Sequence, residues 1–363
     1  MMVVSKQHQI FFDFLRFCIG SAKEIPVSLK EADWKELYCI AQKQCLVGIL
    51  FDGIKKLPAE HVGMKKELLL QWMAESQMLE KANVRLNDAA IQVSEWFRKK
   101  GFRTCILKGQ GNAWMYPNPY SRTPGDIDIW VEGGDKRVIS FVRSISPHEK
   151  ACYHHIEFPS YKGVEVEVHY RPSFLLCFWH NRKLQKYYER VKEEQFSHRV
   201  MLGEQGEIAI PTAEFNLIFQ LTHIYAHLMN EGIGLRQLLD YYYVLSMLNV
   251  NCEMLTSLQK ELKELGLWKF AGGIMYIMQE VFGMPASRLI VPPNEKIGKF
   301  VLNEVLEAGN FGKHDARNRF GRSQLGHNLQ RVYRDMRLVR YFPAEALCEP
   351  LFRTWHFFWR KSI

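Results

Sequence analysis

Two aspartates alternate with isoleucines in the segment GDIDIWV, which predicts a strand that carries paired carboxylates. Asp126 and Asp128 stand at i and i+2, so their side chains share one face of the strand, while Ile127 and Ile129 point into a core. Adjacent carboxylates repel each other unless a proton or a cation separates them. Carboxylate oxygens are ligands that Mg²⁺ uses, commonly together with substrate phosphates. The pattern therefore indicates a metal site for nucleotide chemistry, although many such pairs lie on a solvated strand face.

The turn that precedes this strand has the composition of a phosphate-binding turn. Lys108 and Gly109 follow a short apolar strand, and Gly111 comes two residues later. Glycines let backbone N–H groups approach an anion closely, and the lysine adds a positive charge. The turn therefore favours a role for the aspartates in nucleotide chemistry.

A later segment that reads VEVEVH, residues 164–169, offers a third carboxylate. Its alternation places Glu165, Glu167 and His169 on one strand face and the valines on the other. A third carboxylate beside the two aspartates completes a two-metal clamp for in-line attack on phosphorus, with the ions about 3.5–4 Å apart. The residues alone leave open which glutamate supplies it.

The order of these motifs resembles that of the DNA polymerase β-type nucleotidyltransferase superfamily. More narrowly, LKG…YPNPYSRTPGDIDIWV…VEVHY is similar to a bacterial group usually labelled uncharacterised nucleotidyltransferase. The resemblance is specific over residues 106–131, moderate over 154–171 and weak elsewhere. It implies transfer of an NMP from an NTP, with Mg²⁺ or Mn²⁺ as cofactor.

The resemblance also implies roles for individual residues. An acid-x-His pair closes the later strand in the narrower group, so Glu167 with its neighbour His169 fits the third ligand position better than Glu165. The implied catalytic and metal-binding residues are Asp126, Asp128 and Glu167. The implied nucleotide-binding residues are Lys108, Gly109, Gln110 and Arg122.

The chain departs from the wider superfamily at the turn. Gly109-Gln110 stands where Gly-Ser or Gly-Gly is preferred, and the interval to the first aspartate is longer and filled by NAWMYPNPYSRTP. Both differences concern triphosphate binding more than metal binding. A degenerate copy without catalysis is therefore an alternative.

The surrounding pattern predicts an α+β fold, with a small mixed β-sheet core flanked by helical regions at both ends. Apolar spacing is helical before residue 100 and again after Thr212, and Lys99-Lys100-Gly101 is a typical helix end. The expected division is 1–100 helical, 101–211 nucleotidyltransferase core, and 212–363 helical with a basic end. The core is expected to hold strands at 102–107, 126–131, 154–158 and 164–169, and helices at 109–116 and 135–145.

Two pairs in the second helical region have i, i+4 spacing. His223 and His227 share a helix face, but Ile224 replaces the glutamate of the H-E-x-x-H zinc motif, so we expect them to line a cleft or to form structural hydrogen bonds. Arg236 and Asp240 are either an ordinary helix ion pair or, as the family resemblance implies, residues that face the substrate cleft.

The C-terminal part is basic, with 11 Lys/Arg against 4 Asp/Glu from Phe311 onward. Such an end attracts phosphate-rich polymers or an anionic surface, but a helix over 319–342 with a solvated arginine face is the favoured interpretation. The final segment, FRTWHFFWRKSI, is expected to dock on the protein body, on a second subunit or on a membrane surface. The arginine face comprises Arg331, Arg334 and Arg337, and the opposite apolar stripe comprises Leu329, Val332, Met336 and Val339.

Composition favours a cytoplasmic protein. No apolar run approaches the ~18 residues of a membrane helix, and charged residues interrupt the N-terminal segment where a signal peptide would be apolar. The 8 cysteines are scattered without a C-x-x-C motif, which is typical of free thiols in a reducing compartment.

The sequence thus predicts a nucleotidyltransferase that moves an NMP from an NTP to a hydroxyl-bearing acceptor. A small molecule, a protein side chain and an RNA end are all open as acceptors, and so are the identity of the NTP and the oligomeric state. One alternative is a nucleotide- or RNA-binding protein of the same fold without turnover. Another is a scaffold whose carboxylate face is merely solvated.

Overall fold

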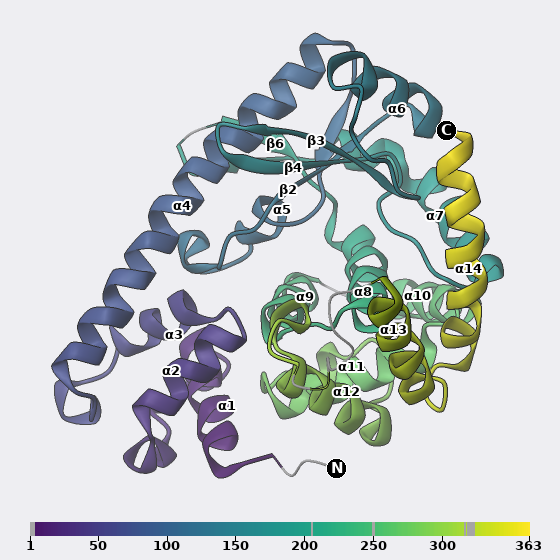
Figure 1. The fold of residues 1–363 in the computed structure, drawn as a ribbon. Helices are drawn as coiled ribbons and strands as arrows, with labels where there is room; N and C mark the ends of the chain where they lie inside the picture. The colour runs from purple at the N-terminus through teal and green to yellow at the C-terminus, as the bar shows by residue number, and fades with distance from the viewer. Residues whose placement is uncertain (1–3, 205, 249–250, 316, 318–323) are drawn as a thin grey trace.

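A small β-sheet at one end of the molecule faces two groups of helices at the other (Figure 1). The computed structural model describes residues 4–204, 206–248, 251–315, 317 and 324–363. The helices are α1 Lys6–Ile19, α2 Trp34–Lys43, α3 Val47–Ile54, α4 Lys66–Lys99, α5 Gln110–Ala113, α6 Gly134–Ile145, α7 Phe178–Ser197, α8 Ala213–Asn230, α9 Leu235–Met247, α10 Cys252–Glu264, α11 Trp268–Glu280, α12 Glu295–Ala308, α13 Gln324–Leu338 and α14 Pro343–Ser362. Short 3₁₀ turns lie at Val27–Glu31, Ala59–His61, Pro119–Ser121, Ala286–Arg288 and Asn310–Gly312.

The sheet has the strand order β1-β2-β4-β3, with one parallel pair at its centre. β2 runs parallel to β4, while β1–β2 and β3–β4 are antiparallel. A separate hairpin, β5–β6, contacts β1 and α4. This mixed sheet with flanking helices confirms the α+β prediction. The strands are β1 Thr104–Ile106, β2 Ile127–Val131, β3 His155–Tyr161, β4 Val164–His169, β5 Arg199–Leu202 and β6 Gly206–Ala209.

One face of the sheet is covered by α6 and by the C-terminal half of α4. Ile127 and Ile129 of β2 pack there with Val166 and Val168 of β4, as their alternation predicts. The long α4 also reaches the N-terminal helices, where Trp72 belongs to the larger core. This helix therefore belongs to two cores and ties the N-terminal region to the sheet.

The opposite face of the sheet carries both apolar and ionisable residues. Trp130 packs on Phe196 of α7 and Phe215 of α8, with ring centroids 4.7 and 5.9 Å apart. Asp128, two residues earlier on the same strand, points to this face. The aromatic contacts therefore hold α8 against the end of the sheet that carries the carboxylate.

Several helix ends follow the expected chemistry. Gly101 has φ 80° just after α4, and the side chain of Thr212 accepts a hydrogen bond from the backbone N–H of Phe215 at the start of α8. Gly234 directly precedes α9. Glycine or threonine therefore stands next to a helix end at each of these positions.

The prediction of a solvated arginine face in the C-terminal part is wrong for two of its three arginines, while the third, Arg331, is exposed. Arg334 is only 8% exposed and donates to the carbonyl oxygen of Glu231 at the end of α8, and Arg337 pairs with Glu304 of α12. Instead Val332 and Met336, from the predicted apolar stripe, are exposed. Carbonyl and carboxylate groups at the ends of neighbouring helices attract the arginines more than solvent does. Residues 318–323 of the predicted helix lie outside the described residues.

The last helix, α14, docks on the protein body. It runs from the helical region to the sheet along one side of the molecule (Figure 1). Phe352 is buried against Tyr153 and Phe174, with ring centroids 5.5 and 5.2 Å away. The C-terminal aromatic segment therefore joins the sheet region to the second helical region. Among the described residues, no helix is both long and apolar enough to cross a membrane.

We expect Asp335→Asn to stabilise the protein above pH 7 and to have little effect below pH 4. Burial and the neighbouring Glu349 raise the pKa of Asp335 to about 7. The folded state therefore favours the protonated acid, so stability falls as pH rises from the unfolded value towards 7. Because Asp335 is partly exposed, solvent screens this repulsion and we expect a gain of about 1 kcal/mol or less. Thermal melts from pH 4 to 9 measure it, with the exposed Glu253→Gln as control. A gain that is equal at all pH values would contradict this explanation.

Candidate functional site

Three carboxylates converge on the sheet face that looks towards α8. Asp126 directly precedes β2, Asp128 lies in β2, and Glu167 is the register partner of Asp128 on the adjacent parallel strand. One ligand oxygen from each lies within 4.8 Å of the other two. The structure therefore brings together the residues that the sequence predicts as metal ligands. Their role as ligands stays a prediction.

Two cationic side chains flank the central carboxylate. Lys108 Nζ lies 2.7 Å from Asp128 Oδ1, and His169 Nε2 lies 2.8 Å from the same oxygen. His169 Nε2 is also 3.4 Å from Glu167 Oε2. Asp128 and His169 are both almost fully buried. Lys108, which the sequence predicts as a phosphate-binding residue, thus contacts Asp128, where a metal ion is expected.

Electrostatic interactions shift the pKa values of the two aspartates in opposite directions. Repulsion from Asp128, together with burial, raises the pKa of Asp126 to about 6. Burial opposes ionisation of Asp128, but Lys108 and His169 outweigh it and hold the pKa of that carboxyl well below its usual range. The pKa of His169 rises to about 9, because the carboxylates outweigh the opposite effect of burial. Asp126 is therefore the group whose ionised form gains most from an added cation.

The glycines of the turn are required by its geometry. Gly109 has φ 57°, a conformation that residues with a Cβ rarely adopt, and it lies beside the carbonyl oxygen of Asp126. Gly111 packs so closely on β1 that a Cβ there would overlap the carbonyl oxygen of Ile106. Gln110, predicted to bind nucleotide, has its side chain buried instead, where it donates to Asn87 of α4. The structure does not bring that side chain to the site.

We expect Gly111→Ala to destabilise the protein by about 1–3 kcal/mol, the usual cost of overpacking. The methyl group would have to push α5 away from β1, and this shift would also move Lys108. Chemical denaturation of Gly111→Ala and of Gly125→Ala measures the effect, because an added Cβ at Gly125 has its nearest neighbour 3.7 Å away. Equal stability of the two variants would contradict the close approach.

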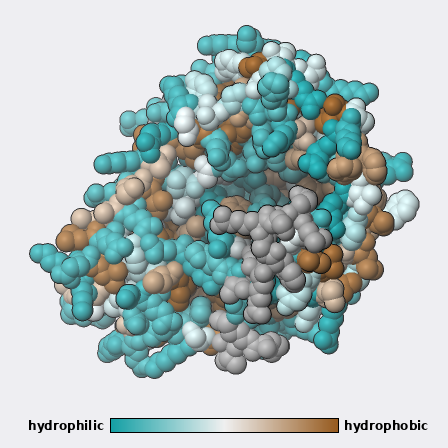
Figure 2. All heavy atoms as spheres, in the orientation of Figure 1, coloured by the Kyte–Doolittle hydropathy of each residue, from teal (hydrophilic) through white to brown (hydrophobic). Residues whose placement is uncertain are grey.

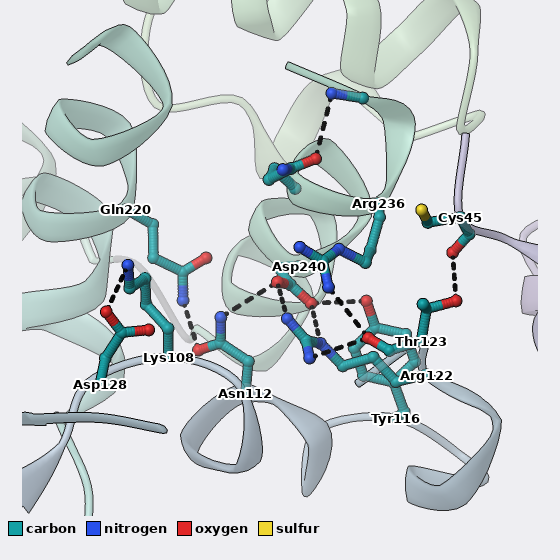
Figure 3. A network of polar contacts seen from close by, with 12 residues as sticks. Cys45, Lys108, Asn112, Tyr116, Arg122, Thr123, Asp128, Gln220, Arg236 and Asp240 are labelled. Atoms are coloured by element: carbon teal, nitrogen blue, oxygen red, sulfur yellow. Dashed lines mark hydrogen bonds and ion pairs between the residues drawn. The ribbon is translucent and has the colours of Figure 1, made fainter. Parts of the chain in front are cut away.

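Asp240 of α9 is the centre of a buried hydrogen-bond network (Figure 3). Arg122 donates to it from Nε and Nη2, each at 2.8 Å, and Tyr116 Oη donates at 2.6 Å. Asn112 Nδ2 donates at 3.2 Å and its Oδ1 accepts from Gln220 of α8 at 2.8 Å. The network fixes the long loop before the metal strand onto α8 and α9.

This network changes the interpretation of the two arginines. Asp240 forms its ion pair with Arg122, 118 residues away, and not the i, i+4 pair with Arg236 that an ordinary helix would form. Arg236 Nη1 donates to the carbonyl of Thr123 at 3.0 Å, and its Nε is buried without a hydrogen-bond partner. Arg236 is therefore better placed than Arg122 to receive an added anion. A phosphate contact from Arg122 stays an untested prediction.

Two adjoining cavities meet at the carboxylates. Asp128, Gly109 and Arg236 line the first, together with Asp240. Glu167 lines the second, which has a volume of about 520 Å³. Asp126 and Lys108 line both cavities. The surface between the sheet and the helical region is hollowed and largely hydrophilic (Figure 2).

The second cavity has a mixed lining from several parts of the chain. Aromatic and imidazole rings alternate with carboxylates, arginines and an amide, and α14 supplies one wall. His223 and His227 line it, as expected from their shared helix face. Glu165 is exposed at the start of β4 and does not line either cavity, so the geometry favours Glu167 as the third carboxylate. The lining includes His154, His155, Phe174, Phe311, Asn230, Glu231, Arg331, Glu349, Phe352 and Arg353.

Several lining residues were not expected from the sequence. Asn112, Gln220 and Gln237 line the first cavity and come from three different helices. No local motif marks them, because amides at isolated helix positions are usually solvent-exposed.

The chain belongs to the uncharacterised nucleotidyltransferase family, whose model matches residues 30–283. A solved structure of an antigenic nucleotidyltransferase-like protein from Paracoccidioides brasiliensis is 11% identical, with a TM-score of 0.33 over 61% of this chain and 97% of that one. At this level the likeness does not identify a shared activity. A search of curated proteins found no match.

Proposed function

We propose that the protein is a metal-dependent nucleotidyltransferase that moves an NMP from an NTP to a hydroxyl-bearing acceptor. The observation that carries this proposal is the position of the three carboxylates where two cavities meet. Asp128 lines the first cavity, Glu167 the second, and Asp126 both. A reaction that joins two substrates needs its charged groups between the two binding spaces.

The residues present fit a divalent cation. All three ligands are carboxylates, and their oxygens lie within 4.8 Å of one another, as hard-cation sites require. Bound Mg²⁺ or Mn²⁺ would neutralise phosphate charge and lower the pKa of the acceptor hydroxyl. Lys108 already provides a positive charge at Asp128, 2.7 Å from its Oδ1, and would have to turn towards phosphate when a metal binds.

The two cavities have lining groups suited to different substrates. Lys108, Arg236 and the glycine turn would bind the triphosphate in the first cavity, where Arg236 retains an unpartnered N–H. The acceptor would occupy the second cavity. Its hydroxyl oxygen forms a bond to the α-phosphorus, the bond to the β-phosphate oxygen breaks, and pyrophosphate leaves. The hydroxyl proton passes to a carboxylate or to water.

A thermal-shift series with each NTP, with and without Mg²⁺ or Mn²⁺, tests the proposal. A ligand that binds only the folded state raises stability by RT ln(1 + [L]/Kd). We expect a metal-dependent shift with at least one NTP, lost in Asp126→Asn/Asp128→Asn when each protein is compared with its own baseline. No shift with any NTP would contradict the proposal. Binding of RNA that weakens steeply with salt, without an NTP shift, would support the RNA-binding alternative.

A further inference from the structure

A second group of metal-ligating side chains lies where the C-terminal helix meets the start of α7, away from the three carboxylates. Cys177 is the N-cap residue of α7 and His180 lies in its first turn, which makes a C-x-x-H pair. Glu345 and Cys348 stand one turn apart in α14, which makes an E-x-x-C pair. Cysteine, histidine and glutamate at such spacings are typical zinc ligands.

The structure brings the two pairs together across 168 residues. The ligand atoms of Cys177, His180 and Glu345 all lie within 4.8 Å of one another. His180 Nδ1 and Glu345 Oε1 are 3.4 Å apart, which is long for a hydrogen bond. A tetrahedral ion with bonds of about 2.0–2.1 Å places neighbouring N and O ligands about 3.3–3.4 Å apart. This pair therefore has the separation of two ligands on one metal.

The glutamate is oriented as a metal ligand usually is. Its Oε2 accepts hydrogen bonds from the backbone N–H groups of Leu176, at 2.6 Å, and Cys177, at 3.2 Å. These bonds leave Oε1 directed towards His180, and Glu345 is only 3% exposed. Outer hydrogen bonds of this kind fix a ligand and tune its basicity. The His180 ring is also held in place, because it packs directly on the backbone of Gly266.

Cys348 offers the fourth ligand from one turn further along α14. Its thiol lies within hydrogen-bonding reach of the Cys177 thiol. Both cysteines are free thiols. Full tetrahedral coordination requires the Cys348 side chain to turn towards Glu345, and two thiol protons then pass to solvent as the metal–sulfur bonds form.

We propose that Cys177, His180, Glu345 and Cys348 bind one zinc ion that fastens α14 to the start of α7. Such a site would fix Glu349, Phe352 and Arg353 of the same helix in the wall of the second cavity. Glu345 and Cys348 lie beyond the part of the chain that the family model matches. The proposal does not depend on nucleotidyl transfer.

Metal titration of the full chain under a thiol-free reductant tests the site. The protein is stripped with a chelator and titrated with Zn²⁺ against a chromophoric competitor, and in parallel with Co²⁺ as a spectroscopic probe. We expect one tight equivalent, a thiolate-to-cobalt charge-transfer band and a higher melting temperature. No tight equivalent, or a cobalt complex without that band, would overturn the proposal.

Variants locate the bound metal. Cys177→Ser and Cys348→Ser should each weaken binding by on the order of 100-fold or more, because loss of a ligand costs at least as much as loss of an outer hydrogen bond. Cys152→Ser is the matched control, since Cys152 belongs to a different histidine-containing group beside the second cavity, and the exposed Cys39→Ser is a second control. Loss of the tight equivalent in Cys152→Ser, with binding unchanged in Cys177→Ser, would overturn the assignment.

Discussion

Asp126→Asn is expected to slow nucleotidyl transfer by about 10²–10³-fold while it raises the melting temperature of the metal-free protein. Repulsion from Asp128, together with burial, raises the pKa of Asp126 from 3.8 to about 6. A shift of this size corresponds to about 2–3 kcal/mol against the ionised form as an upper limit. The neutral amide removes that repulsion. It also removes one of three ligands, and loss of one group that stabilises transition-state charge costs about 10²–10³-fold in rate.

The sign of the pH dependence follows from the raised pKa. The folded protein prefers protonated Asp126, so metal-free wild type should gain stability as pH falls from 7 towards 4. The Asp126→Asn variant should lose most of that dependence. Differential scanning fluorimetry in chelator measures both proteins, and Glu165→Gln is the control because Glu165 is exposed on the strand that carries Glu167. A variant that is less stable than wild type at pH 8 would contradict the proposed repulsion.

Asp240→Ala is expected to destabilise the protein by about 3–5 kcal/mol, the usual cost of leaving a buried charge unpaired. Arg122 is 4% exposed and directs two hydrogen bonds to Asp240. Without the carboxylate, that guanidinium and the Tyr116 hydroxyl lose an acceptor that water cannot replace. Urea denaturation of the variant measures the loss.

A double variant separates the charge effect from simple loss of packing. Replacing both members of a buried ion pair by apolar residues of similar size is often neutral. We therefore expect Arg122→Met/Asp240→Leu to be more stable than Asp240→Ala. A double variant that is less stable than Asp240→Ala would contradict the view that the unpaired charge of Arg122 causes the loss.

The strands and the carboxylate face were predictable because their cause is local. Alternation in residues 126–131 and 164–169 determines which side chains enter the core, whatever the rest of the chain does. To predict that Asp128 and Glu167 lie side by side, one must also know that β2 pairs in parallel with β4. No pattern within either strand specifies that pairing, and the family resemblance supplied it.

The buried arginine contacts could not be predicted from the sequence, because they join residues that lie far apart in the chain. Arg122 and Asp240 are 118 residues apart, so no spacing rule connects them. The inverted face of α13 has the same origin, because Arg334 and Arg337 turn towards groups on α8 and α12 that only the fold brings close. Periodicity shows that a helix has two faces, and the neighbouring elements decide which face is buried.

The most direct measurement is anomalous diffraction from crystals soaked with Mn²⁺ and a non-hydrolysable NTP analogue. We expect an anomalous peak among the carboxylates of Asp126, Asp128 and Glu167, with the triphosphate bound to it and Lys108 moved away from Asp128. The same soak of Asp126→Asn/Asp128→Asn should give no peak there. A wild-type crystal that contains the analogue but no metal between these carboxylates would contradict the proposed metal-dependent mechanism.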